Sequence, residues 1–139
     1  MAGEGIRRVL LHGSSEESFD RAIRLAGKLT QGFGAELHVV YTVEEPLSGG
    51  WTAEMPAARL PELHQAMEEE ARERLSRVLS PELQRDVIVA IRTGPAADEL
   101  VRYTEEHTID LAIVQASDES GRSLADRGHC SVLLLRHRA

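Results

Sequence analysis

The chain has 139 residues, of which 42% are hydrophobic and 28% charged, and this ordinary globular composition excludes long disordered stretches. The formal net charge of −7 disfavours nucleic acid and anionic membranes as partners, because both are bound largely through Lys and Arg. No linker or internal repeat is visible, so we predict one domain over residues 1–139.

The first predicted strand, residues 6–11, is short and aliphatic and runs into His-Gly-Ser-Ser. Ser14 followed by Glu17 matches a capping box and predicts a helix start, and Gly32 and Gly34 predict the exit. Apolar residues at spacings of three and four predict the buried stripe of this helix: Phe19, Ala22, Ile23, Ala26 and Leu29.

Residues 36–43 are rich in β-branched residues and predict the second strand, which is followed by a Pro- and Gly-containing loop over residues 44–58. An amphipathic helix is predicted over residues 60–78, ended by Ser80-Pro81. Its solvent side carries three expected i,i+4 ion pairs: Glu68–Arg72, Glu70–Arg74 and Glu73–Arg77.

Residues 87–93 predict a third strand, closed by Gly94-Pro95 at the start of a third helix. Residues 111–114 and 132–135 are continuous aliphatic runs, as in strands covered on both faces, and the polar segment between them predicts only a short helix. Strands that alternate with helices require right-handed crossovers, so the predicted fold class is a doubly wound α/β domain with a largely parallel sheet.

In an open parallel sheet, ligands bind at the carboxyl ends of the strands where the winding reverses. Gly13, Ser14 and Ser15 either present N–H groups to an anion or merely cap the helix. His12 is either a general base or phosphate ligand, or an ordinary strand-end side chain. The candidate crevice residues are His12, Gly13, Ser14, Ser15, Thr42, Ala116 and Ser117.

The sequence gives no support for catalysis, a metal or a cofactor. It contains no P-loop, G-x-G-x-x-G or G-x-S-x-G motif, and its histidines lack zinc-site spacing. Asp118, Glu119 and Asp126 resemble a magnesium cluster only in composition, and we expect them to be solvated. Cys130 is the single cysteine and is expected to be structural. With no signal peptide and no membrane span predicted, we expect a cytoplasmic protein.

Four stretches of the chain form one combined pattern: VLLHGSSEESFDRAIRLAGKL, GAELHVVYTVEEP, RTGPAADELVRYTEEHTIDLAIV and HCSVLLLR. This pattern resembles the universal stress protein family and covers nearly the whole chain. The resemblance implies a five-stranded parallel sheet in the order 3-2-1-4-5, of the adenine nucleotide alpha hydrolase-like type. It also implies a homodimer paired through the last strand, at Val132, Leu133, Leu134 and Leu135.

Many members of that family bind ATP through an Asp that ends the first strand and a G-x-x-G-x9-G-[S/T] loop after the fourth. Here Gly13 stands at the acidic position, and the first two loop glycines fall on Ala116 and Glu119. The connection from Val114 to Cys130 is shorter than the family pattern, so the next helix is expected to be shortened. Asp118 and Glu119 would also repel phosphates. We therefore expect a family member that does not bind ATP.

Three functions remain open at this point. The first is a dimeric binding module for stress response or signalling with a possible protein partner, in which Trp51 of the 44–58 loop is a contact anchor, a lid or a covering residue. The second is a small-ligand or nucleotide sensor, for ATP- or AMP-like molecules, that uses the candidate crevice. The third is an enzyme that depends on His12 alone, and it has the least support.

Overall fold

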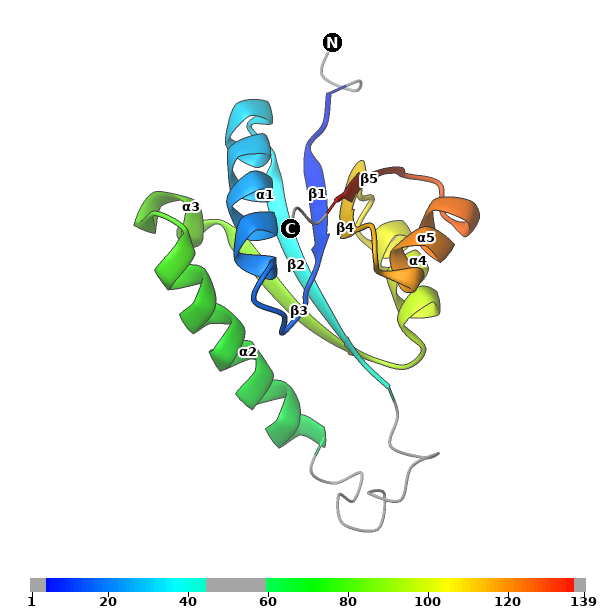
Figure 1. Cartoon of the computed structure of the whole chain (residues 1–139), viewed down its shortest axis with the longest axis horizontal. Coiled ribbons are helices and arrows are strands. Elements are labelled where there is room, and N and C mark those ends of the chain that lie inside the picture. Colours follow the sequence, from blue (N-terminus) through cyan, green and yellow to red (C-terminus); the bar gives the residue numbers. More distant parts are fainter. Residues whose placement is uncertain (1–4, 45–59, 137–139) are drawn as a thin grey trace.

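The computed structural model describes residues 5–44 and 60–136, and in this part of the chain five strands are connected by five helices, two of them between the second and third strands (Figure 1). The strands are β1 (Arg8–His12), β2 (Glu36–Val43), β3 (Val87–Thr93), β4 (Leu111–Gln115) and β5 (Ser131–Leu135). The helices are α1 (Phe19–Phe33), α2 (Leu60–Val78), α3 (Pro81–Arg85), α4 (Ala96–Glu106) and α5 (Glu119–Arg127).

All five strands are parallel and lie in the order β3-β2-β1-β4-β5, which confirms the predicted doubly wound sheet. The first strand is central, and it pairs with β2 from Arg8↔Glu36 to His12↔Val40 and with β4 from Val9↔Leu111 to Leu11↔Ile113. The winding therefore reverses between β1 and β4, where a parallel sheet places its ligand crevice.

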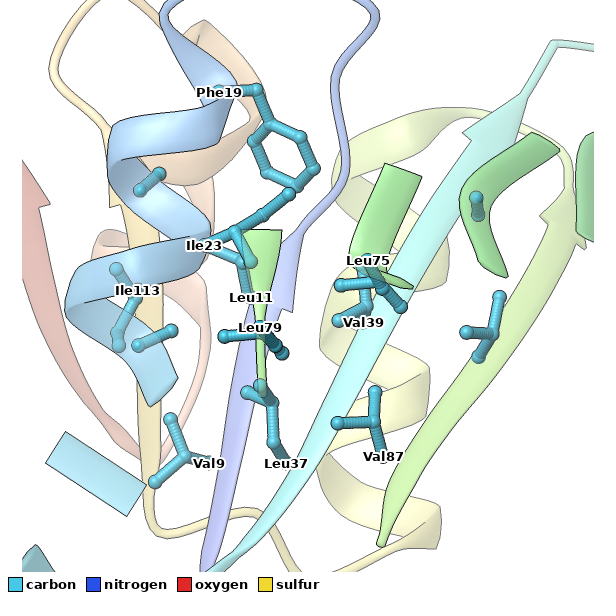
Figure 2. Packing of buried hydrophobic residues seen from close by; sticks show 14 residues of the cluster. Val9, Leu11, Phe19, Ile23, Leu37, Val39, Leu75, Leu79, Val87 and Ile113 are labelled. Atoms are coloured by element: carbon cyan, nitrogen blue, oxygen red, sulfur yellow. The ribbon is translucent and has the colours of Figure 1, made fainter. Parts of the chain in front are cut away.

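Helices cover both faces of the sheet, with α1 and α2 on one side and α4 and α5 on the other (Figure 1). Successive residues of a strand point to opposite faces. Val9 and Leu11 thus enter the core under α1 and α2, where Figure 2 shows Phe19, Ile23 and Leu75 packed against the strands. Leu10 enters the second core, with Leu100, Tyr103 and Leu124. Burial on both faces explains the continuous aliphatic runs.

The start of α1 differs from its prediction. The helix begins at Phe19 after a turn in which the Phe19 N–H donates to the Glu16 carbonyl (3.1 Å), and the side chain of the N-cap residue Ser18 makes no capping bond. The Ser14 hydroxyl accepts instead from the Glu16 N–H (3.0 Å), so the capping box is wrong. The exit at Gly34 is confirmed, with a left-handed φ of 66°.

The charges of α2 also differ from their prediction. No ion pair forms at the three expected i,i+4 positions, all of which lie in the described part of the chain. Arg72 donates to the Val87 carbonyl (2.8 Å), and Arg74 pairs with Asp20 of α1 (2.7 Å). Arg72 and Arg74 therefore join α2 to other elements.

The sequence also predicted the end of a helix at Ser80-Pro81 and a loop over residues 44–58. After Ser80, Pro81 starts the short helix α3, which the sequence did not predict. The 44–58 loop falls outside the described residues from position 45 onward, and Trp51 with it.

None of the described helices is long and apolar enough to cross a membrane.

Candidate functional site

A hydrogen-bonded bridge joins the ends of β1 and β2 to the start of α5. His12 ends β1, and its Nδ1 lies 2.5 Å from Oδ2 of Asp118 while its Nε2 lies 3.0 Å from Oγ1 of Thr42. The His12 and Asp118 side chains are only 11% and 21% exposed. The His12–Asp118 bridge, as we call this contact, spans the β1–β4 point where the winding reverses.

Asp118 is ionised in this arrangement. Burial by itself would raise the pKa of Asp118, but the hydrogen bond and positive charge from His12, together with the backbone N–H groups of Gly121 and Ser120, lower the pKa below its usual value. An ionised carboxylate can only accept, so Nδ1 of His12 carries the proton that it donates. Since Nε2 is hydrogen-bonded to Thr42, both ring nitrogens of His12 take part in hydrogen bonds.

The same carboxylate caps helix α5. Asp118 is the N-cap residue, and its Oδ1 accepts from the Ser120 N–H at 3.0 Å. A helix N-terminus attracts negative charge because its first N–H groups lack partners within the helix. Here a carboxylate of the chain itself supplies that charge.

Gly13 follows His12 and lies directly under the Tyr41 ring. Its N–H donates to the Val40 carbonyl at 2.7 Å, and a Cβ atom at this position would lie 2.5 Å from the ring. The ring also packs edge-on against Phe19, with 6.2 Å between centroids, and burial raises the pKa of Tyr41. A side chain at position 13, where the family resemblance expects an acid, would have to displace the Tyr41 ring.

A small cavity opens beside Gly13 between the ends of β1 and β2 and helix α2. Its volume is about 230 Å³. Its lining combines polar and apolar groups: Gly13, Ser14, Ser15, Tyr41, Thr42, Met67, Glu70, Ala71 and Arg74. Ligand pockets usually measure about 300–1,000 Å³, so this cavity suits only a small molecule or part of a larger one.

Arg74 holds the loop that forms one wall of this cavity. Its guanidinium donates to the carbonyls of Ser14 (3.0 Å) and Glu16, and to the carboxylate of Asp20 (2.7 Å). It also lies over the Phe19 ring, 5.1 Å from the centroid, and its side chain is 15% exposed. Sequence reasoning assigned Arg74 to solvent, because helical spacing does not show which distant loop a side chain reaches.

The predicted crevice residues fall into three groups. The first group, His12 and Thr42, meets in the bridge, and Gly13, Ser14 and Ser15 line the cavity together with Thr42. Ala116 and Ser117 belong to neither; Ala116 donates to the Leu135 carbonyl (2.7 Å), and Ser117 is exposed.

The prediction that Asp118 is merely solvated is wrong. Its neighbour Glu119 is exposed, so the two carboxylates have different roles in the structure.

The short connection from β4 to α5 places the helix directly on the strand. A Cβ atom at Gly121 would lie 2.5 Å from the Val114 side chain, so only glycine permits this approach. Among residues 5–44 and 60–136, no group of three His, Cys, Asp or Glu side chains is placed to hold a metal ion.

Strand β5 forms one edge of the sheet. Leu133 and Leu135 pack against the core under α1, and Val132 packs against the core under α4 and α5. Leu134 is 42% exposed. All four residues of the predicted dimer contact thus lie on an edge strand.

A parallel sheet of order 3-2-1-4-5 with helices on both faces is the adenine nucleotide alpha hydrolase-like α/β fold. The family model for the universal stress protein family matches residues 5–136, so the chain belongs to that family. None of the curated proteins compared matches the chain.

Solved structures show the same fold. The universal stress protein UspA from Lactobacillus plantarum is 17% identical with a TM-score of 0.74, and the match covers 95% of this chain and 99% of that one. A universal stress protein in complex with cAMP is 21% identical with a TM-score of 0.64, covering 95% and 98%. The universal stress protein from Archaeoglobus fulgidus in complex with dAMP is 12% identical with a TM-score of 0.65, covering 93% and 96%.

Proposed function

We propose that this universal stress protein is a dimeric binding module of stress response or signalling in the cytoplasm, that it does not bind ATP, and that it is not an enzyme. The observation that carries the proposal is the His12–Asp118 bridge. It occupies the β1–β4 end of the sheet, where a doubly wound domain takes its ligand.

The negative charge and the small volume at the β1–β4 end of the sheet both disfavour binding of a triphosphate. Phosphates bind where helix N–H groups and small residues let the backbone approach them. The N-terminus of α5 already holds the Asp118 carboxylate, whose negative charge would repel a phosphate. The nearest cavity, at about 230 Å³, is also small for a nucleotide.

The absence of catalysis is part of the same proposal. A general base needs a ring nitrogen that can reach the substrate, but Asp118 and Thr42 engage both nitrogens of His12. We expect no nucleotide hydrolysis by the purified chain. Turnover that disappears in a His12→Ala variant would contradict this expectation.

Isothermal titration with magnesium-ATP at low salt tests the main point. The whole chain is expected to give no saturable heat. An Asp118→Ala variant removes the repelling charge, and any affinity that it gains would show that the carboxylate is what excludes phosphate. A micromolar dissociation constant for the unmodified chain would overturn the proposal.

The proposed dimer is argued from the exposed edge of strand β5. An edge strand leaves backbone N–H and C=O groups open to pairing, and natural proteins usually cover or charge such edges. Here the edge residues are aliphatic, and Leu134 is exposed. An antiparallel copy of β5 would cover both the open backbone and Leu134. The net charge of −7 favours proteins over nucleic acids or anionic membranes as further partners.

A second candidate function is a small-ligand sensor at the cavity beside Gly13. The hydroxyls of Ser14, Ser15 and Thr42 and the guanidinium of Arg74 supply polar groups there. Two relatives of the same fold carry cAMP and dAMP. Thermal denaturation with AMP or cAMP tests this function, since a ligand of the folded state raises Tm. An unchanged Tm at millimolar nucleotide would exclude it for these ligands.

A further inference from the structure

A second cavity, of about 310 Å³, lies between helix α1 and the edge strand β5. It shares no residue with the His12–Asp118 bridge or with the cavity beside Gly13. We propose that this α1–β5 cavity binds a small amphiphile that has a carboxylate head and a short aliphatic tail.

The walls of the cavity suit an aliphatic tail. Leu25 comes from the second turn of α1, and Leu135 comes from the end of β5, with its side chain on the face of the sheet that α1 covers. Both side chains are only partly buried. Covering such surface with an alkyl chain is favourable, because it removes apolar area from water.

The rim of the cavity suits an anionic head. Arg21 and Arg136 both line it, and Nη1 of Arg21 lies 3.4 Å from the Arg136 carbonyl oxygen. Neither guanidinium takes part in the ion pairs found within residues 5–44 and 60–136. Arginine is the residue that best matches the planar, two-oxygen geometry of a carboxylate.

Arg21 and Arg136 are both exposed at this cavity, and their positive charges favour a negatively charged ligand group there. Ser18 and Gln115 complete the polar side of the cavity, joined by a hydrogen bond from the Ser18 hydroxyl to Oε1 of Gln115 (3.2 Å). A cavity with aliphatic walls and a few converging polar groups is the usual form of a small-molecule site. Its volume of about 310 Å³ is at the lower end of the range for small-molecule sites.

Octanoate is a suitable probe, with acetate as the head alone and 1-octanol as the tail alone. In methyl NMR spectra of the isotope-labelled whole chain, octanoate is expected to saturate at one site and to shift the methyl signals of Leu25 and Leu135. Acetate and 1-octanol should each bind at least about tenfold more weakly, because each lacks one of the two contacts.

Matched variants locate the head. Arg21→Gln and Arg136→Gln should each weaken octanoate about tenfold or more. Arg24→Gln, an exposed position on α1 that does not line the cavity, should leave it unchanged. Arg21 lies on α1 rather than on β5, so a loss of octanoate in its variant is separable from a loss of the proposed dimer.

The inference is overturned if octanoate gives no saturable shifts, or if the shifts map away from this cavity. It is also overturned if 1-octanol binds as tightly as octanoate, or if both arginine variants keep full affinity.

Discussion

The Asp118 side chain forms hydrogen bonds with two elements of the fold at once. Its two carboxylate oxygens serve different elements, since Oδ2 accepts from His12 of β1 and Oδ1 accepts from the first turn of α5. A carboxylate that is hydrogen-bonded on both sides favours its charged form. The bridge is thus an electrostatic contact whose strength depends on pH.

Replacing Asp118 with Asn tests this charge while keeping a good helix cap. Because the pKa of Asp118 is lowered in the fold from 3.8, its contribution is present above that value and is lost as the pH falls through the lower folded pKa. D118N should therefore lower the free energy of unfolding at pH 7 by about 1–2 kcal/mol. The difference in the free energy of unfolding between D118N and the unmodified chain should shrink below about pH 4.

Urea denaturation at several pH values measures this effect. Glu119→Gln is the control, because this neighbouring carboxylate is exposed and should change stability by less than about 0.5 kcal/mol. A D118N difference that stays constant down to acid pH would show that the charge of Asp118 is not involved.

Gly13 offers a second test at the residue scale. A methyl group there would lie 2.5 Å from the Tyr41 ring, so Gly13→Ala should cost about 1–3 kcal/mol of stability. Gly32, within α1, has nothing within 4 Å of an added Cβ, and Gly32→Ala should instead stabilise by about 0.5–1 kcal/mol. Thermal or urea denaturation compares the two variants.

A Tyr41→Leu change in the Gly13→Ala background removes the obstructing ring. If the ring causes the cost, the double variant should lose less stability than the sum of the two single changes. Strict additivity would mean that Gly13 is needed for another reason.

At the scale of elements, Arg74 couples α2 to the start of α1. The carbonyls to which it donates belong to the loop between β1 and α1, and its guanidinium lies over the Phe19 ring. The position of this loop decides the shape of the cavity beside Gly13, because Ser14 and Ser15 line it.

Arg74→Met should therefore destabilise the chain by about 2–3 kcal/mol and speed amide hydrogen exchange in the first turn of α1. Arg77→Met is the matched control, since Arg77 is exposed on the same helix and should change stability by less than about 0.5 kcal/mol. Equal effects of the two substitutions would contradict the role given to Arg74.

The sequence predicts most elements because local patterns encode them. The bounds of β2, α2 and β3 agree with prediction, since β-branched runs and helical spacing depend on neighbouring residues only. The start of α1 was misplaced because the Ser14 hydroxyl bonds within its own loop. The strand order came from the family resemblance rather than from periodicity.

The site was predicted only in part. Position at a strand end identified His12 and Thr42, because the ends of parallel strands share one edge of the sheet. Asp118 and Arg74 were missed as contacts, since their partners lie on other elements far away in sequence. A carboxylate directly before the helix that follows the fourth strand was the available signal for Asp118.

At the scale of the whole molecule, the two edges of the sheet are unequal. Strand β3 is at one edge and β5 at the other, and each exposes one large aliphatic side chain: Ile88 at 38% and Leu134 at 42%. Ile88 on β3 is therefore a matched control position for the dimer proposed through β5.

Leu134→Asp should convert the dimer to a monomer, because it places a charged side chain on each of the two pairing strands. Ile88→Asp changes a residue of similar exposure on β3 and should leave the dimer intact. Light scattering after size-exclusion chromatography measures both masses. A monomer for the unmodified chain, or dissociation by the β3 variant alone, would contradict pairing through β5.

The central place of β1 has a consequence for synthesis on the ribosome. One neighbour, β2, emerges soon after β1, whereas the other, β4, begins only at Leu111. Until then the nascent chain can assemble β1, β2 and β3 under α1 and α2 while the far side of β1 stays unpaired. An open inner strand of this kind invites wrong pairing between nascent chains, so the period before β4 emerges is when chaperones would matter most.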